Sequence, residues 1–489
     1  RDRAGEKPLF YWCDEVKKEF RFASELKALM ADASFPRRID LDALNHYLGY
    51  GYVPGEMCML QGLRKLPQGS AMTYDLRSNR PVLWEYWRLP ESPPPQAGDE
   101  HALTEQLHSL LGESVRRRMI ADVPVGIMLS GGIDSSLVTA MAAEVSTRPV
   151  KTFTISFPGH GSYEEGPYAR RVAEHFGTEH TELVAEPATV GMLPELARQY
   201  DEPMADSSMV PTYMVSRMIR LSATVALGGD GGDELFGGYP TYSWILQMAS
   251  VRRFLPGPLR RWALRALRRS IPLGRFGRNY LLALAEDLPG SIAQMNLFFD
   301  ERYRKSLLAS DLGDRLGGDI TGPEARKRDI QQAYSTPLQK ITAMDFRTFL
   351  VDDILAKVDR ASMLSSLEVR SPFLDHRIIE FAYSQVPDDL RATRRERKIL
   401  PRRLAEQLLP PGMDLSRKQG FTLPLQDWFR GEWGRYCSDV LLSGGQELFR
   451  RDAIERLLGD QQRGRLHTQR LFALTMFELW RREYNVSPP

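Results

Sequence analysis

The sequence predicts an α/β protein with a parallel β-sheet at its centre and a helical second half. Between residues 103 and 227, strand-like and helix-like segments alternate, as parallel sheets with crossover helices require. Two of the predicted strands run directly into glycine-rich loops, and such loops are where open parallel sheets bind ligands. From residue 240 onward the pattern is mostly helical, with Pro and Gly interruptions.

Length, composition and charge fit an ordinary globular protein. The chain has 489 residues, which at about 150 residues per domain predicts about three domains. Apolar residues make up 42% and charged residues 26%, so wholesale disorder is excluded. The 65 basic and 63 acidic side chains leave a net charge of +2, which argues against a nucleic-acid coat protein.

Cysteine usage and hydropathy predict a cytoplasmic protein without a membrane partner. Cys13, Cys58 and Cys437 are too few for a disulfide framework, and their spacing fits no zinc site. No apolar run reaches the roughly 18 to 20 residues that span a bilayer. The chain opens Arg1-Asp2-Arg3 and soon enters a strand-like stretch, so we expect the downstream part of a longer protein.

Residues 1–90 predict short strands and turns, followed by a linker. The segment 90–99 holds four prolines and no apolar periodicity, which is typical of an exposed connection. The predicted domains are therefore 1–90 and 103–489, joined by 91–102. Strands are expected at 8–12, 20–23 and 70–74, and short helices at 24–30 and 42–47.

The alternating region begins after this linker. Its apolar run 123–129 is continuous, which predicts a strand buried on both faces. Helices are expected at 103–117, 133–144 and 165–176, and strands at 123–129, 150–157, 180–184 and 223–227, with two helical segments before the last strand.

The first chemical motif is Ser130-Gly-Gly-Ile-Asp-Ser-Ser136, between a buried strand and a helix. Two glycines allow a tight turn, and the free N–H groups of the helix start attract an anion. The loop lacks the Gly-Lys-Ser/Thr ending of a Walker A motif, which argues against γ-phosphate transfer. We interpret it as a phosphate cradle. The plainer alternative is a glycine turn with Asp134 or Ser135 as the helix cap.

The second motif is Leu227-Gly-Gly-Asp-Gly-Gly-Asp-Glu-Leu-Phe-Gly-Gly-Tyr239, which also follows a strand. Asp230, Asp233 and Glu234 place carboxylates beside the expected anion site, as a bridging Mg²⁺ would require. Asp134 is a natural fourth ligand. The alternative is a flexible acidic loop.

Two further segments carry weaker signals. Asp201-Glu-Pro-Met-Ala-Asp-Ser-Ser208 fits either the wall of the same cleft or a helix cap. Lys418 lies two residues before a glycine in Ser416-Arg-Lys-Gln-Gly-Phe-Thr-Leu-Pro424 and fits either a charge on a transition-state phosphate or a solvated lysine.

Together the motifs resemble a known family. The heptad 130–136 is similar to the pyrophosphate loop of ATP pyrophosphatases. With loop 228–239 and segments 357–363, 367–375 and 417–421, the chain resembles bacterial-type, glutamine-hydrolysing asparagine synthetases. This resemblance implies a parallel-sheet ATP-pyrophosphatase (adenine nucleotide alpha hydrolase-like) synthetase domain with a helical C-terminal half. It also implies that residues 1–90 are the remnant of an αββα class II glutaminase domain.

The resemblance implies ATP and Mg²⁺ as cofactors. A carboxylic acid, normally aspartate, is adenylated at the α-phosphate, and ammonia, from glutamine in the complete enzyme, then displaces AMP. Asp230 and Lys418 are the implied catalytic residues, and Asp134 and Asp233 the implied metal ligands. The implied nucleotide and pyrophosphate positions are Leu129, Ser130, Gly131, Gly132, Asp134, Ser135, Ser136, Ile155, Gly228 and Gly229. Around the acceptor acid we expect Asp201, Asp206, Ser207 and Glu234.

Two departures from the family pattern bear on activity. Gly228 stands where the family usually has Ser, which removes one hydroxyl contact to nucleotide. The family's nucleophilic N-terminal cysteine lies upstream of the match to Arg1, and Cys13 is expected to be a packed thiol inside a strand. We therefore expect free ammonia to be the nitrogen source of this polypeptide.

Three alternatives stay open at this stage. The same chemistry could serve another acid, because a few pocket side chains decide the acceptor. A tRNA-modifying pyrophosphate-loop enzyme would use the basic stretches 252–269 and 391–403, although solvated helix faces are the simpler interpretation. A non-catalytic scaffold is disfavoured by the intact Asp134, Asp230, Asp233 and Lys418. A glutaminase-like sheet that pairs with itself favours a homodimer.

Overall fold

The N-terminal part contains two small antiparallel sheets and two helices. The computed structural model describes residues 1–14, 16–156, 165–184, 189–252, 256–415, 425–444 and 447–489. One sheet has the order β2-β1-β3 and the other pairs β4 with β5. The elements are β1 (Phe10–Asp14), β2 (Glu19–Ala23), α1 (Leu26–Leu29), α2 (Leu41–Tyr50), β3 (Leu63–Lys65), β4 (Ser70–Asp75) and β5 (Arg80–Glu85).

The expected elements of this part are confirmed, and two strands were not anticipated. β3 is only three residues long, and β5 contains Pro81 and is mostly exposed, so neither carries a clear period-2 pattern. Helix α2 begins where the Asp40 carboxylate accepts a hydrogen bond from the Ala43 N–H. It ends at Gly51, whose φ of 87° suits the left-handed cap that glycine favours.

The central sheet is parallel throughout, as predicted, and has the strand order β10-β9-β6-β7-β8. The sequence of strands runs outward from β6 to β8 and then returns to the other side of β6. The sheet therefore has a topological switch point between β6 and β9, where the loops after these strands diverge. The strands are β6 (Val125–Met128), β7 (Lys151–Ser156), β8 (Glu179–Val184), β9 (Val225–Leu227) and β10 (Glu368–Arg370).

Two details of the sheet differ from expectation. Strand β6 begins at Val125, and only its two middle residues are buried. Val123, which was expected in this strand, lies before it and is 42% exposed. β10 was not anticipated, because three residues give no periodic signal and its partner β9 lies far away in the chain. It pairs in parallel through Glu368↔Val225 and Arg370↔Leu227.

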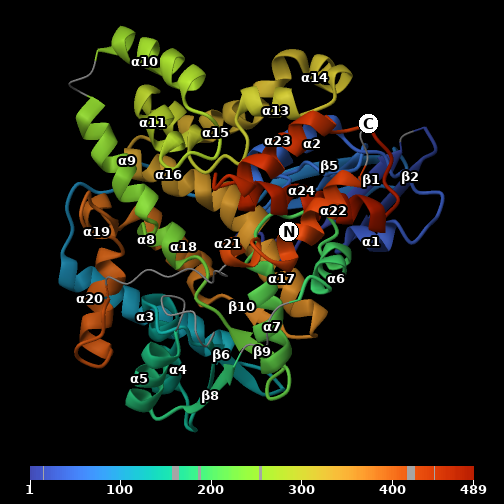
Figure 1. Cartoon of the computed structure of the whole chain (residues 1–489). Helices are drawn as coiled ribbons and strands as arrows, with labels where there is room; N and C mark the ends of the chain where they lie inside the picture. The colour runs from blue at the N-terminus through green and yellow to red at the C-terminus, as the bar shows by residue number, and fades with distance from the viewer. Residues whose placement is uncertain (15, 157–164, 185–188, 253–255, 416–424, 445–446) are drawn as a thin grey trace.

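The rest of the chain is mostly helical (Figure 1). The helices between the strands are α3 (Glu100–Arg118), α4 (Ile133–Val145), α5 (Gly166–Phe176), α6 (Met192–Gln199) and α7 (Met209–Ile219). After β9 follow α8 (Gly232–Phe236), α9 (Pro240–Val251), α10 (Gly257–Ser270), α11 (Arg278–Ala285), α12 (Leu288–Gln294), α13 (Glu301–Leu307), α14 (Ser310–Leu316), η3 (Gly317–Thr321), α15 (Gly322–Gln332), α16 (Pro337–Asp345), η4 (Phe346–Ile354) and α17 (Leu355–Leu364). After β10 follow η5 (Pro372–Leu374), α18 (His376–Ser384), α19 (Asp388–Arg391), α20 (Ile399–Leu408), α21 (Leu425–Trp428), α22 (Glu432–Leu442), α23 (Arg451–Gln462) and α24 (Thr468–Glu483).

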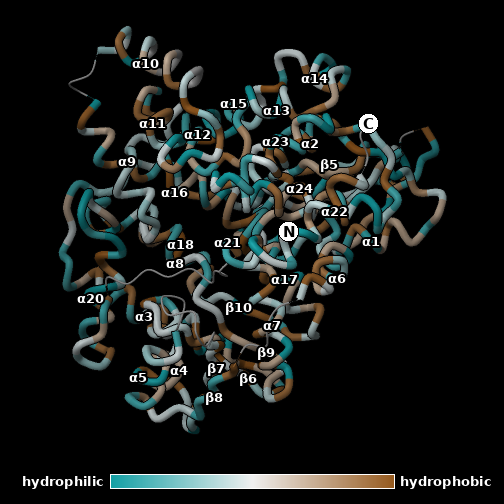
Figure 2. The backbone as a smooth tube through the Cα atoms, viewed as in Figure 1, coloured by the Kyte–Doolittle hydropathy of each residue, from teal (hydrophilic) through white to brown (hydrophobic). Residues whose placement is uncertain are grey.

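Helices cover both faces of the central sheet. On one face Ile127 and Leu227 pack in a core with α3 and α4. On the other face Phe153 and Ala226 share a core with α7 and α17. Hydrophobic and hydrophilic residues alternate along most helices (Figure 2), as expected when one face of each helix packs against a neighbour. None of the helices in the described ranges is long and apolar enough to cross a membrane.

The end of the chain packs against its beginning. The Tyr47 hydroxyl donates to the carbonyl of Ala473 on α24 over 2.7 Å, and Arg38 forms a β-bridge with Ser487. The same apolar core includes residues of α2, α6, α7 and α24. The N-terminal part is therefore anchored to the helical C-terminal part through a shared core.

Candidate active site

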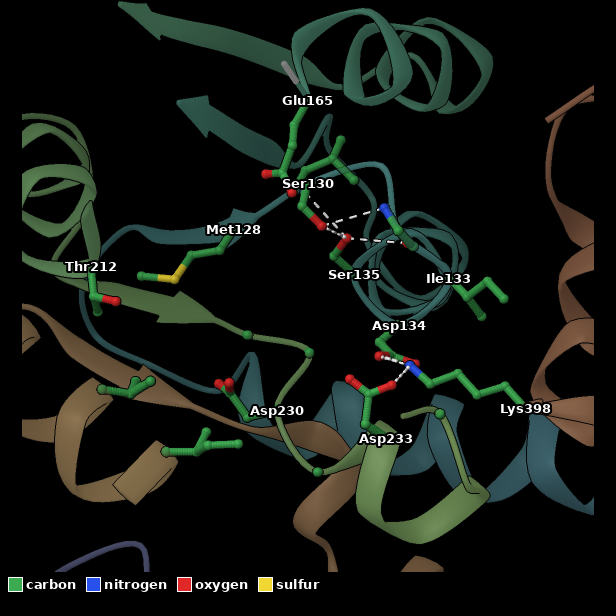
Figure 3. A pocket seen from close by; sticks show the side chains of 18 of the residues that line it. Met128, Ser130, Ile133, Asp134, Ser135, Glu165, Thr212, Asp230, Asp233 and Lys398 are labelled. Atoms are coloured by element: carbon green, nitrogen blue, oxygen red, sulfur yellow. Dashed lines mark hydrogen bonds and ion pairs between the residues drawn. The ribbon is translucent and has the colours of Figure 1, made fainter. Parts of the chain in front are cut away.

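A cavity of about 260 Å³ opens at the switch point of the sheet (Figure 3). Both glycine-rich loops line it, so the structure brings together the two motifs that the sequence placed after separate strands. Of the predicted site residues, Leu129, Ser130, Gly132, Asp134, Ser135, Ile155, Gly228, Gly229, Asp230, Asp233 and Glu234 line this cavity.

The first loop is held in shape by its own serines. The Ser130 N–H donates to the Ser135 Oγ over 3.2 Å, and the two hydroxyl oxygens lie 3.0 Å apart. The Gly132 N–H donates to the Ser130 Oγ over 3.3 Å. Helix α4 starts directly after this loop without a side-chain cap, which is the arrangement that presents N–H groups to an anion.

Two residues of the predicted pyrophosphate loop lie away from the cavity lining. Gly131, with a φ of 74°, sits against Tyr168 and Ala169 at the start of α5. Ser136 is fully buried in α4. These two positions shape and anchor the loop in this structure.

The second loop can approach the first only because it has glycines at two positions. A Cβ at Gly229 would lie 2.9 Å from the Asp134 Cβ, and one at Gly232 would lie 2.6 Å from the Asp134 Oδ1. Both distances are too short for real Cβ contacts. The loop is also fixed from β10, because the Gly228 N–H donates to the Arg370 carbonyl over 2.9 Å.

Gly228 lies beside the Asp230 carboxylate in the second loop. A Cβ at this residue would lie 2.8 Å from the Asp230 Oδ2. The absence of a side chain at residue 228 therefore leaves room for the Asp230 carboxylate. Asp230 projects into the cavity, apart from the neighbouring Asp233 (Figure 3).

Asp134 and Asp233 converge on a lysine that sequence analysis did not single out. The Lys398 ammonium forms ion pairs with the Asp134 carboxylate and, over 2.6 Å, with the Asp233 Oδ1 (Figure 3). Burial opposes its charge, but the two carboxylates raise the pKa of Lys398 above its ordinary value. The interpretation of 391–403 as a solvated basic face is wrong for Lys398 and for Arg391, which is fully buried and donates to the Leu235 carbonyl.

The residues that suit a divalent cation here are a pair of carboxylates, those of Asp134 and Asp233. Among the described residues, no three His, Cys, Asp or Glu side chains gather as a metal site, so the expected grouping of Asp230, Asp233 and Glu234 is not present. Asp134 and Asp233 already enclose one cationic group, the Lys398 ammonium. Mg²⁺ is usually held by one or two carboxylates together with substrate phosphates, and this pair fits that pattern.

The residues expected around an acceptor acid separate into two groups. Glu234 lines the cavity, where its Oε1 accepts a hydrogen bond from the Tyr239 hydroxyl over 2.6 Å. Burial and the adjacent Asp233 raise the pKa of Glu234 to about 8. Asp206 and Ser207 are not among the lining residues, but the Asp206 Oδ2 lies 2.7 Å from the Nζ of Lys357, which does line the cavity.

Asp201 is not among the residues that line the cavity, and it lies in a buried network of ion pairs. It is 1% exposed and its Oδ2 is 2.9 Å from the Arg360 guanidinium. Its Oδ1 pairs with Lys27 over 3.2 Å, and its carbonyl accepts from the Trp480 indole N–H over 2.5 Å. The expectation that Asp201 borders the acceptor is therefore replaced by a role at the junction of α1, α17 and α24.

Several lining residues were missed. Glu165, Lys357, Arg397 and Lys398 all border the cavity, yet single charged residues outside a motif carry no sequence signal of a site. Lys357 lay within a segment that carried the family resemblance, which is the one hint available. Lys418 falls in 416–424, outside the described residues, while the preceding Leu415 lines the cavity.

The fold and the cavity define a class: an α/β protein with a cavity at the switch point of a parallel sheet, between two glycine-rich loops. Comparison with known proteins gives the family. Residues 106–482 match the family model described as asparagine synthase, and residues 1–87 match the glutamine amidotransferase domain. The chain belongs to the asparagine synthase family and carries sequence of an N-terminal glutamine amidotransferase domain.

Named relatives agree with this membership. The chain is 33% identical over 495 aligned residues to a putative glutamine-hydrolysing asparagine synthetase of Mycobacterium tuberculosis, with 98% of this chain and 73% of the relative covered. It is 29% identical to glutamine-hydrolysing asparagine synthetase 1 of Bacillus subtilis, with 98% and 74% covered. It is also 27% identical to the amidase chry2 of Gibberella zeae, with 80% and 61% covered.

Proposed function

We propose that this protein forms an amide from a carboxylic acid and ammonia at the expense of ATP, through an acyl-adenylate. Aspartate is the proposed acid, and the products are asparagine, AMP and pyrophosphate. The observation that carries the proposal is the meeting of the Ser130–Ser135 loop and the Asp230–Glu234 loop around one cavity. Membership of the asparagine synthase family supports ATP as the activating substrate.

The proposed first step is adenylation. A carboxylate oxygen of the acid attacks the α-phosphorus, a new P–O bond forms, and the bond from the α-phosphorus to the bridging oxygen of pyrophosphate breaks. Loop 130–135 and the start of α4 supply N–H and hydroxyl donors to the leaving pyrophosphate. Asp134 and Asp233 are the residues that would hold Mg²⁺, which neutralises phosphate charge when bound. Lys418 is proposed to stabilise charge on the α-phosphate.

The proposed second step is attack of ammonia on the acyl carbon. The N–C bond forms and the C–O bond to AMP breaks, while the ammonia nitrogen must lose a proton. Asp230 is the proposed acceptor of that proton, because its carboxylate projects into the cavity from the second loop. Activation is needed since a free carboxylate is a poor electrophile, whereas AMP is a good leaving group.

The acceptor end of the cavity is proposed to be the side lined by Glu234 and Lys357. Lys357 carries a positive charge there, because Asp206 and Asp353 raise its pKa against the effect of burial. The Lys357 ammonium suits a carboxylate of the acid, and the Glu234 carboxyl can accept a hydrogen bond from its amino group. The second candidate is another carboxylic acid, since the family includes differently named relatives such as amidase chry2.

Ammonia is the proposed nucleophile of the second step, and glutamine is its proposed source in the complete enzyme. Cys13 lies inside β1, opposite Phe20 on β2, and as an internal residue it has no α-amine to act as its base. The glutaminase nucleophile is therefore not proposed among Cys13, Cys58 and Cys437.

The test measures AMP, pyrophosphate and asparagine from Mg²⁺-ATP and aspartate, with either ammonium or glutamine. Equal amounts of AMP and asparagine with ammonium are expected. Asp233→Asn and Lys418→Ala should each abolish AMP formation, whereas the exposed control Asp329→Asn should retain it. Activity that survives both site substitutions would refute the site. AMP formation with a different acid, and none with aspartate, would refute the acceptor.

A further inference from the structure

The Lys398 ammonium takes the place between the two carboxylates assigned to the metal. Its Nζ forms ion pairs with both Asp134 and Asp233. These side chains belong to three separate elements: Asp134 to α4, Asp233 to α8 and Lys398 to the residue before α20. A single cation thus joins both glycine-rich loops to a distant helix.

The surrounding backbone builds this position into the fold. Lys398 has a left-handed φ of 52°, and its N–H donates to the Phe236 carbonyl at the end of α8 over 3.2 Å. Gly238 leaves the necessary space, because a Cβ there would lie 1.8 Å from the Asp233 Oδ1 and 2.4 Å from the Lys398 Cε. The Lys398 side chain is 8% exposed, so it is not a surface lysine in a chance orientation.

Charge balance indicates what this arrangement does. Two largely buried carboxylates without a cation would repel each other and attract a divalent ion. With Lys398 between them, the group has a net charge of −1, and the oxygens that face each other are already engaged. A divalent cation that enters must replace the ammonium, so the two cations compete for one position.

We propose that Lys398 is an internal counter-ion that keeps divalent cations out of the site until nucleotide phosphates arrive. The added phosphate charge then offers the ammonium a second partner, and the metal enters together with the nucleotide. The ligand-free protein consequently binds Mg²⁺ or Mn²⁺ weakly. This inference rests on Asp134 and Asp233 as metal ligands, as in the proposed function, and it is independent of the acceptor acid.

The test is Mn²⁺ binding to the protein without nucleotide, measured by electron paramagnetic resonance of free Mn²⁺. If the ammonium holds the position about nine-tenths of the time, its removal tightens binding about tenfold. Lys398→Met should therefore bind one Mn²⁺ about tenfold or more tightly than the unaltered protein. The double variant Lys398→Met with Asp233→Asn should lose this gain, and Lys305→Met, an exposed lysine on α13, should match the unaltered protein.

Equal Mn²⁺ affinity of the unaltered protein and Lys398→Met would overturn the proposal, as would a gain that persists without the Asp233 carboxylate. The folding of the variant provides a second readout. Lys398→Met and Lys398→Gln should have thermal midpoints that rise with added Mn²⁺, since the metal replaces the lost charge, while the midpoint of the unaltered protein should rise less at the same Mn²⁺ concentration. Variants that stay unfolded at millimolar Mn²⁺ would also count against it. No arm contains ATP or acid, so a failure of the proposed reaction does not affect this outcome.

Discussion

Gly131 offers the most direct test of how the first loop is built. Its φ of 74° costs a residue with a side chain about 1–2 kcal/mol. A Cβ there would also lie 2.5 Å from the Tyr168 Cβ and 2.7 Å from the Ala169 backbone nitrogen. Because a backbone atom cannot swing away, the start of α5 must shift, and such overpacking costs typically about 1–3 kcal/mol. Gly131→Ala should therefore destabilise the protein by about 2–5 kcal/mol.

Gly177 supplies the matched control. It ends the same helix, α5, with a φ of 61°, and a Cβ there would meet nothing within 4 Å. Gly177→Ala should thus show the backbone cost alone, about 1–2 kcal/mol. The assay is urea-induced unfolding of both variants, followed by fluorescence and circular dichroism. If Gly131→Ala is no more destabilising than Gly177→Ala, the close packing of the loop on α5 is refuted.

Two further predictions concern buried carboxylates. Burial raises the pKa of Asp345 from 3.8 to about 6, although its bond from the Tyr242 hydroxyl opposes the shift. The unfolded chain thus loses this proton at lower pH than the folded one, and the free energy of unfolding should fall by up to about 3 kcal/mol as pH rises through that window. Asp345→Asn should lack this fall, and an identical pH profile from urea titrations would contradict the assignment. Asp201→Asn should destabilise the protein by about 1–3 kcal/mol, because Arg360 and Lys27 lose a buried charged partner while Arg360 keeps its ion pair with Glu25. It should leave the KM for the acceptor acid unchanged, and a selective rise in that KM would return Asp201 to the acceptor pocket.

The sequence predicts the centre of the fold and both loops because their signals are local. The segments that form β6, β7 and β9 are short apolar runs, which can be recognised from adjacent residues alone. Glycines mark the turns that follow two of them. Lys398 could not be found in this way. Its role arises from an ion pair with Asp134, 264 residues earlier in the chain, and its neighbours in sequence are mostly basic residues that carry no signal of a site.

Asp201 illustrates the opposite error. Its segment has the composition of a site loop, with acidic and hydroxyl residues around a proline, and the same composition serves turns and caps. Only the tertiary contacts with Lys27 and Arg360 distinguish the two. Asp206 lies in the same short segment, and its partner Lys357 connects that residue to the cavity.

The short strand β10 has a consequence for how the protein acquires its site. Its pairing closes a chain segment that extends from Val225 to Glu368, and such non-local contacts form late because the entropy of closing the loop must be overcome first. The Gly228 N–H bond to the Arg370 carbonyl cannot exist before that closure. A polypeptide that ends before Glu368 would contain every residue of both glycine-rich loops and still leave the second without its anchor. During synthesis, competence to bind nucleotide should therefore appear only after the ribosome has released that distant strand.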